Sequence, residues 1–452
     1  MTSTETQPAR AGLPSKETLA ELVSLALAEA KRAGASEAEA AISVDIGLSV
    51  NVRRGEVDTL EHQRDRGLGV TVYFGKQKGS ASSSDFRKAS VLETVQAACA
   101  IARHTSADPA QGLADPELLA REIPDLDLYH PWDLEPEDAI RMARECEAVA
   151  LAADARICNS DGAEVSSRSG LRVYGNSHGF LAGYAASRHG LSCVVVGKEG
   201  DAMQRDYWYT TSRVAAALET AAEVGRRAAE RTLRRLGARR LPTMRVPVLY
   251  VPEVARGLLG HFIGAISGGA LYRKASFLLD HLGKQVFPDF VHIEEQPHRP
   301  RALGSAPFDL EGVATRQRTL VEDGVLQGYV LSSYSARKLG LQSTGNAGGV
   351  PNLVIRPGSL DFRGLLREMG RGLVVTELMG QGVNTLTGDY SRGASGFWVE
   401  DGEIAYPVQE ITVAGNLRDM FRNLRAVGSD VDSRGNILTG SLLLDEMTVA
   451  GE

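Results

Sequence analysis

The chain has 452 residues, of which 43% are apolar and 24% charged, and its formal net charge at pH 7 is −7. This length exceeds that of a typical single domain, so we expect two domains, each with enough apolar residues to bury a core. A mildly acidic chain lacks the basic face that nucleic acid requires, so we expect no nucleic-acid partner. No segment approaches the roughly 18 consecutive apolar residues of a membrane span, which predicts no membrane partner.

The beginning of the chain and its cysteines indicate the compartment. Residues 1–14 are polar and are expected to be disordered, and they contain no apolar segment typical of a secretory signal. The four cysteines are not spaced like zinc ligands, and we expect buried, reduced thiols at Cys99, Cys146, Cys158 and Cys193. Together these features predict a soluble protein of the cytoplasm.

Residues 15–240 are predicted to form an N-terminal α/β domain in which helices flank a mainly antiparallel sheet. Ser15 can cap the first of the helices predicted at 15–34, 90–103, 136–153 and 212–236. Strand patterns occupy 40–44, 48–52, 67–74, 78–82, 165–174, 179–186 and 191–196. A Pro- and Asp-rich segment near 106–135 is predicted to be a surface connection. A basic cluster ends the last helix and is interpreted as favourable to the helix dipole and to solubility: Arg234, Arg235, Arg239 and Arg240.

Residues 241–452 are rich in glycine and are predicted to form a large antiparallel β domain with a few helices. The clearest strand patterns are at 246–251, 315–321, 325–331, 372–378, 396–400 and 403–406. Asp323-Gly324 and Asp401-Gly402 each separate two of these segments and predict tight hairpin turns. The fold class predicted for the whole chain is therefore α+β.

Motifs that would activate water or a nucleophile are missing or incomplete. HExxH and HExxxH, in which two imidazoles bind zinc and a glutamate acts as base, do not occur, because no histidine is followed directly by glutamate. His292 and His298 flank two glutamates, but Pro297 would break a helix between them. Gly175-Asn176-Ser177-His178-Gly179 has the spacing of a nucleophile elbow, yet the next segment is strand-like, which favours a hairpin turn.

Two segments are particularly dense in glycine, 264–269 and 345–349. Neither has the spacing of a phosphate-binding loop or opens a dinucleotide-binding unit. Glycine also allows a second backbone to approach closely, which suits a site that binds an extended peptide as an added strand. Composition and spacing alone therefore predict an α+β protein with a Gly-rich β domain and leave its function open.

Long strings of the sequence carry a resemblance to a known family. They are Lys78–Phe86, Ser106–Asp115, Tyr174–Phe180, Gln204–Arg213, Glu253–Gly283, Ser332–Gly349, Glu377–Ile404 and Glu410–Leu417. In these strings the chain resembles the TldD/PmbA peptidases over nearly its whole length after residue 15. The resemblance implies an α/β domain followed by a mainly antiparallel β domain. It also implies a heterodimer that degrades unfolded peptides and trims leader segments from ribosomally made peptides such as microcin B17.

In that family the TldD-type subunit carries HExxxH and a later cysteine ligand. The shared Gly-His step places the motif on Arg256–His261, so that Arg256 and Gly257 stand where the first histidine and the glutamate should be. Only His261 remains, and no cysteine follows Cys193, whereas a catalytic zinc needs three protein ligands. The resemblance therefore implies no catalytic residue and no metal or other cofactor in this chain. Zinc is expected in the TldD-type partner, and His261 is expected to be structural or interfacial.

The resemblance suggests how such a subunit could contribute. We hypothesise that the Gly-rich domain pairs with its counterpart in the TldD-type subunit and completes a cleft for unfolded or leader peptides. The candidate substrate-binding residues are Ser267, Gly268, Gly269, Asn346, Gly348, Gly349, Gly380, Gln381 and Gly382. These glycines could equally form turns inside the domain. Two alternatives remain: a regulatory or peptide-binding protein with no part in the active site, or a hydrolase that uses Ser177, Ser391 or Ser395.

Overall fold

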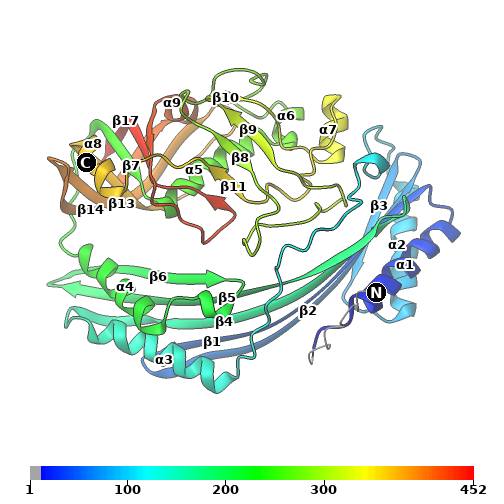
Figure 1. Cartoon of the computed structure of the whole chain (residues 1–452), viewed down its shortest axis with the longest axis horizontal. Helices are drawn as coiled ribbons and strands as arrows, with labels where there is room; N and C mark the ends of the chain where they lie inside the picture. The colour runs from blue at the N-terminus through cyan, green and yellow to red at the C-terminus, as the bar shows by residue number, and fades with distance from the viewer. Residues whose placement is uncertain (1–11, 452) are drawn as a thin grey trace, which may run out of the picture.

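The computed structural model describes residues 12–451 and consists of two halves (Figure 1). In the first half a long, curved sheet carries its helices on the convex side, and the second half lies over the concave side (Figure 1). The prediction of a disordered segment at 1–14 falls largely outside the described residues. Within those residues, no helix is both long enough and apolar enough to cross a membrane.

The sheet of the first half is antiparallel and has the strand order β3-β2-β1-β4-β5-β6. Its strands are β1 (Glu37–Arg53), β2 (Glu56–Phe74), β3 (Gln77–Ser83), β4 (Ile157–Asn176), β5 (Leu181–Glu199) and β6 (Ala202–Ser212). Alternate residues such as Ile42 and Val44 are buried, while Ser43 and Asp45 between them are partly exposed, as expected for a strand with one covered face.

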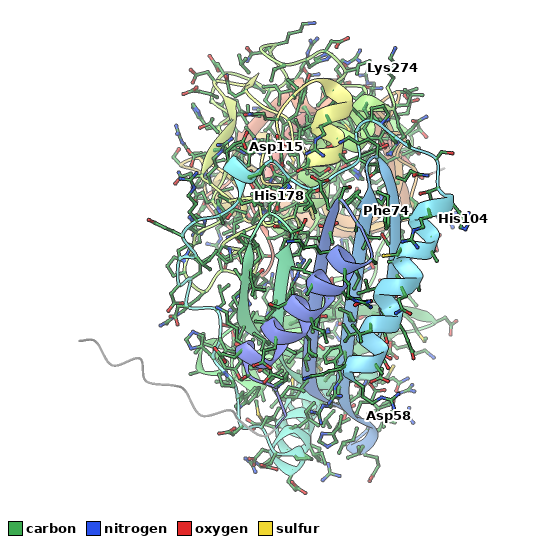
Figure 2. All side chains as sticks on the ribbon, turned by 90° about the vertical axis from the view of Figure 1, so that its right-hand side faces the viewer. Asp58, Phe74, His104, Asp115, His178 and Lys274 are labelled. Atoms are coloured by element: carbon green, nitrogen blue, oxygen red, sulfur yellow. The ribbon has the colours of Figure 1, made fainter. Side chains whose placement is uncertain are left out.

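Four helices cover the buried face in two pairs, α1 (Lys16–Arg32) with α2 (Lys88–His104), and α3 (Pro136–Ala152) with α4 (Ala221–Arg234). Ser15 caps α1 by accepting a hydrogen bond from the Thr18 amide at 3.1 Å. Figure 2 views the end covered by α1 and α2, where Asp115 and His178 lie at the boundary with the second half. There His178 Nδ1 lies 3.1 Å from the Ala114 carbonyl oxygen.

The second half contains two sheets, with strand orders β14-β13-β12-β7-β17-β15 and β10-β9-β8-β11-β16. Its strands are β7 (Met244–Tyr250), β8 (Ile293–Glu295), β9 (Arg318–Glu322), β10 (Val325–Leu326), β11 (Leu353–Ile355), β12 (Gly372–Met379), β13 (Asp389–Glu400), β14 (Glu403–Asn416), β15 (Leu424–Val427), β16 (Ile437–Leu438) and β17 (Leu442–Ala450). Its helices are α5 (Pro252–Ala265), α6 (Gly268–Tyr272), α7 (Ser333–Leu339), α8 (Phe362–Met369) and α9 (Leu417–Arg422).

The predicted α+β class is confirmed, but several details differ from the sequence prediction. The second half is mixed rather than purely antiparallel, since β7 pairs with β12 and β11 with β16 in parallel. The predicted helix at 212–236 begins only at Ala221, where Thr220 caps it; Ser212 still belongs to the edge strand β6, and residues 215–217 form a separate 3₁₀ turn. The strand pairs predicted at 40–44 with 48–52, and at 179–186 with 191–196, are each one continuous strand.

The turn predictions are confirmed by backbone geometry. Asp323-Gly324 and Asp401-Gly402 have φ angles of 47° and 74°, and of 51° and 76°, which is the left-handed pair that a tight hairpin requires. Ser177 lies in the turn between β4 and β5, so its segment is a hairpin and not a strand–helix elbow. One cysteine prediction is wrong: Cys158 is exposed, because it lies on an outward-facing position of β4, while the other three thiols are buried.

Candidate functional site

Helix α5 carries the segment on which the metal motif would fall, and Arg256 lies in its first turns. Its Nη2 donates to the Tyr209 hydroxyl of β6 at 2.9 Å, and its Nε donates to the Glu253 carbonyl at 3.0 Å. A carboxylate oxygen of Asp432 is 4.0 Å from Nη2. Arg256 therefore connects the second half to the edge strand of the first.

A second arginine completes this connection. Arg434 pairs with Asp432 at 2.9 Å and with Glu253 at 3.1 Å, and its guanidinium lies 4.1 Å from the ring centre of Trp208. Burial alone would raise the pKa of Asp432, but hydrogen bonds from Arg434 and the charge of that residue lower the pKa below its ordinary value. The carboxylate is thus held ionised between two arginines.

His261 lies elsewhere on α5. It is five positions after Arg256, and at about 100° per residue the two side chains project in directions roughly 140° apart on the helix. The imidazole is partly buried, and its ring centre is 6.1 Å from that of Tyr390 in an edge-on arrangement. Burial, and secondarily the charge of Arg392, lower the pKa of His261, which favours the neutral form.

The first group of predicted binding residues surrounds the start of α6. Ser267 caps this helix and forms a parallel bridge with Val330. Gly268 is buried, and a Cβ at this position would collide with the side chain of Ser335. At Gly269 the atoms that a Cβ would meet belong to the flexible Arg273 side chain, the nearest at 3.4 Å.

The second group lies in the loop before β11. Asn346 is 5% exposed, and its amide donates to Glu295 at 2.6 Å and accepts from Arg318 at 2.7 Å. Gly348 and Gly349 have φ angles of 101° and 114°, and a Cβ on Gly348 would meet Leu310 while one on Gly349 would meet nothing. Asn346 therefore takes part in a buried ion-pair network, and the glycines permit the turn that follows.

The third group, Gly380, Gln381 and Gly382, is exposed and follows the end of β12. The Gly382 carbonyl accepts a hydrogen bond from the Ser391 amide at 2.7 Å, so the two backbones lie close together. Within residues 12–451, no hydrogen bond or ion pair joins any of the three groups to another. The Ser395 hydroxyl donates to a carboxylate oxygen of Glu377 at 3.1 Å, and no histidine among residues 12–451 forms a hydrogen bond with it.

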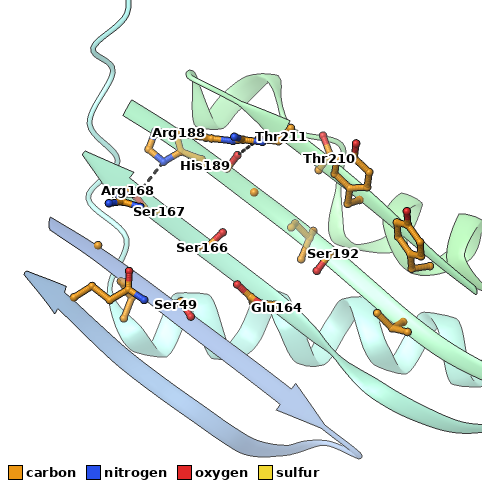
Figure 3. A pocket seen from close by; sticks show the side chains of 18 residues that line it. Ser49, Glu164, Ser166, Ser167, Arg168, Arg188, His189, Ser192, Thr210 and Thr211 are labelled. Carbon is orange, nitrogen blue, oxygen red and sulfur yellow. Dashed lines mark hydrogen bonds between the residues drawn. The ribbon is translucent and has the colours of Figure 1, made fainter. Parts of the chain in front are cut away.

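A hollow of about 500 Å³ lies on the concave face of the long sheet, opposite the face that its four helices cover (Figure 3). Many of the residues that line it have polar side chains, among them Ser49, Glu164, Ser166, Arg188, Ser192 and Thr211. Arg188 Nε donates to the Thr211 hydroxyl at 3.1 Å, and the cross-strand pair Ser167–His189 is held at 3.0 Å (Figure 3). Tyr209 belongs to the same lining, so the bond from Arg256 places α5 at the edge of this hollow.

Comparison with known proteins identifies the family. Models described as PmbA/TldA metallopeptidase domain 1, central domain and C-terminal domain match residues 38–102, 129–236 and 243–451. The chain is 54% identical to metalloprotease PmbA of Escherichia coli O157:H7 over 97% of each chain. It belongs to the PmbA/TldD metallopeptidase family, as a PmbA-type member. A metalloprotease PmbA homolog of Haemophilus influenzae is 51% identical over 96% of this chain and 97% of that protein.

Solved structures share the fold. A protein of Bacteroides thetaiotaomicron, described as a proposed modulator of DNA gyrase, superposes with a TM-score of 0.91 at 29% identity, over 96% of this chain and 98% of that one. TldE of Thermococcus kodakarensis superposes with a TM-score of 0.84 over 96% of this chain and 100% of that one. At 21% identity, the second likeness concerns the fold alone.

A metallopeptidase family implies zinc, but the residues at the motif position of this chain do not fit it. Arg256 is a cation already bound to Tyr209, Gly257 has no side chain to act as base, and His261 is the only residue at the motif positions whose side chain could bind a metal. Among residues 12–451, no three His, Cys, Asp or Glu side chains lie close enough to hold a metal ion. A catalytic zinc site needs three such ligands.

The sequence interpretation missed the hollow and misjudged the basic cluster at the end of α4. Its arginines contact the second half: Arg235 pairs with Glu377 at 2.7 Å, Arg234 and Arg239 lie over the rings of Phe397 and Tyr406 at 5.0 and 4.7 Å, and Arg240 pairs with Glu410. Capping and solubility are therefore not their main role. The sequence pattern that could have indicated the hollow is the alternation of polar residues in β1 and β4, which predicts a sheet face that no helix covers.

Proposed function

We propose that this chain is the non-metal subunit of a heteromeric metallopeptidase and that a TldD-type partner supplies zinc and the catalytic residues. The observation that carries the proposal is the contact of Arg256. At the position where the family motif has its first histidine, an arginine is bound to Tyr209 and lies 4.0 Å from Asp432. At that position this chain has a contact between its two halves.

The substrates proposed are unfolded peptides and the leader segments of ribosomally made peptides, in the manner of microcin B17. The hollow on the sheet offers hydroxyl groups and both signs of charge to an extended chain. A second backbone could come close to Gly349 and Gly380, where a Cβ would meet nothing, and to Gly269, where it would meet only the movable end of Arg273. We therefore keep the three glycine-containing groups as the proposed wall of a cleft that the partner completes. The proposed compartment is the cytoplasm.

The test is peptidase activity on an unfolded peptide, with bound zinc quantified, for this chain alone, for a TldD-type subunit alone and for their mixture. The proposal expects this chain to be inactive and free of stoichiometric zinc, and the mixture to cleave. Activity or stoichiometric zinc in this chain alone would overturn it.

The same mixture separates the proposed role from that of a regulator outside the active site. Gly269→Trp places a bulky side chain at a position where a Cβ meets only Arg273. Loss of cleavage with intact assembly supports the cleft role. Unchanged cleavage favours a subunit that acts away from the active site. Glu403→Trp, at the exposed first residue of β14, is the matched control because it adds the same bulk far from the glycine groups in sequence.

A further inference from the structure

Three polar side chains, His261 of α5 with Tyr390 and Arg392 of β13, lie near one another in the second half. Tyr390 and Arg392 are two residues apart in β13 and therefore project from the same face of the sheet. Tyr390 belongs to the core cluster that contains Phe262 of α5, and its ring lies edge-on to His261 at 6.1 Å. This cluster of His261, Tyr390 and Arg392 thus connects the core of the second half with its surface.

Two polar atoms of this cluster lack a hydrogen-bond partner among residues 12–451. Tyr390 is 2% exposed, and among the described residues its hydroxyl has no hydrogen-bond partner of good geometry. Nε of Arg392 is likewise buried and unpartnered. The hydroxyl of Tyr250 and the guanidinium of Arg392 both lie near the Tyr390 hydroxyl, and the hydrogen bond of Tyr250 goes to Met447 Sδ at 3.4 Å. Buried polar groups are almost always hydrogen-bonded, so two such atoms at one place indicate a missing acceptor.

The charge of the cluster indicates what kind of acceptor is missing. Arg235, Arg318 and Arg434 each pair with a carboxylate of this chain, whereas Arg392 forms no ion pair with any residue in 12–451. Arg392 is only partly exposed, and a charged group removed from water is costly unless it is paired or hydrogen-bonded. With His261 favouring its neutral form, the cluster carries one formal positive charge, which matches a carboxylate better than a doubly charged phosphate.

We propose that His261, Tyr390 and Arg392 form a binding site for a carboxylate group. The Arg392 guanidinium donates to the carboxylate, as its planar fork of N–H groups suits that anion, and the Tyr390 hydroxyl donates from the buried side. His261 lies on the third side. The negative charge of the bound carboxylate favours the protonated imidazole, which donates a hydrogen bond to it. The carboxylate comes either from the C-terminus of a bound peptide or from an acidic side chain of a partner subunit.

The experiment uses the full chain with N-acetyl-Ala-Ala and its C-terminal amide as probes. Calorimetry measures binding, and the resonances of selectively labelled histidines report on His261. The free acid is expected to bind and to raise the pKa of His261, while the amide does not. Arg392→Gln is expected to weaken binding of the acid at least tenfold, and Tyr390→Phe several-fold. The control Arg425→Gln removes a surface arginine that pairs with Glu368 and should leave binding unchanged.

Thermal unfolding separates a binding role from a structural one. Because Arg392 has no partner in the free chain, Arg392→Gln should leave the Tm unchanged or raise it. A Tm that falls by several degrees would mark Arg392 as a structural residue and overturn the proposal. Equal binding of acid and amide would also overturn it.

A further arm identifies the source of the carboxylate. Binding of the acid by the chain alone assigns a peptide terminus. If the acid does not bind but Arg392→Gln weakens association with a TldD-type subunit at least tenfold, the partner supplies the carboxylate. If neither occurs, the site does not exist. Each result is independent of whether the mixed complex cleaves peptides, so the proposed function can fail separately.

Discussion

The guanidinium of Arg256 donates to the hydroxyl of Tyr209 at 2.9 Å, and this bond joins α5 of the second half to β6 of the first. The two residues are 47 positions apart in sequence. Tyr209 lines the hollow on the long sheet, so the helix that carries the degenerate motif is fixed at the edge of that hollow. The relationship makes Arg256 part of the contact between the halves.

Tyr209→Phe should therefore destabilise the chain. A hydrogen bond to a charged group contributes about 1.5–3 kcal/mol, and Arg256 is partly solvent-exposed, so we expect the free energy of unfolding to fall by about 1 kcal/mol. Urea unfolding measures this change. Tyr207→Phe is the matched control, because Tyr207 stacks beside Tyr209 but is 43% exposed. An equal loss in both variants would show that the hydroxyl of Tyr209 is not what matters.

Two adjacent glycines should respond differently to the same substitution. Gly268→Ala places a Cβ against Ser335 of α7, and overpacking of this kind costs about 1–3 kcal/mol. Gly269→Ala meets only the movable end of Arg273 and should change stability by less than about 0.5 kcal/mol. Thermal unfolding of both variants tests the difference. If Gly269→Ala is the more damaging, the assignment of Gly268 to packing is wrong.

Local patterns were readable from the sequence, and long-range pairings were not. The Ser15 cap and the Asp401-Gly402 hairpin depend on a few neighbouring residues, and both were predicted correctly. The sequence pattern indicates no strand at 202–211 and places Ser212 in the following helix. The edge strand at these residues is defined by its pairing with β5 and not by its own periodicity. The contacts of Arg256 with Tyr209 and of His261 with Tyr390 also join residues that are far apart in sequence, so no local pattern predicts them.

The buried pair of Glu295 and Arg318 should be the most sensitive ion pair to disruption. Their side chains are 2% and 13% exposed and lie 2.8 Å apart, and Asn346 binds to both. Arg318→Met leaves Glu295 charged and unpaired in the interior, which should cost about 3–5 kcal/mol. Arg425→Met removes an arginine from an exposed pair with Glu368 and should cost less than about 1 kcal/mol. Chemical unfolding compares the two, and similar losses would contradict the expectation.

The stability of the chain should depend on the ionisation of Asp309. Burial, and secondarily the charge of Glu311, raise the pKa of this carboxyl from 3.8 to about 7, although its oxygens accept three backbone hydrogen bonds. Between these values the folded state keeps a proton that the unfolded state has lost. The free energy of unfolding attributable to Asp309 is therefore greatest below pH 4 and falls as pH rises toward 7, by at most about 1.4 kcal/mol per unit.

Asp309→Asn removes this titration. The substitution itself costs stability, because an amide N–H₂ would face the Ala347 N–H that now donates to Oδ2 at 2.9 Å. That cost should shrink as pH rises from 4 to 7, since only the unsubstituted chain loses stability over this range. Urea unfolding of both chains at half-unit intervals measures the difference. Asp201→Asn, at an exposed hairpin position, should show a constant difference. If Asp309→Asn also gives a constant difference, Asp309 does not retain its proton in the folded chain.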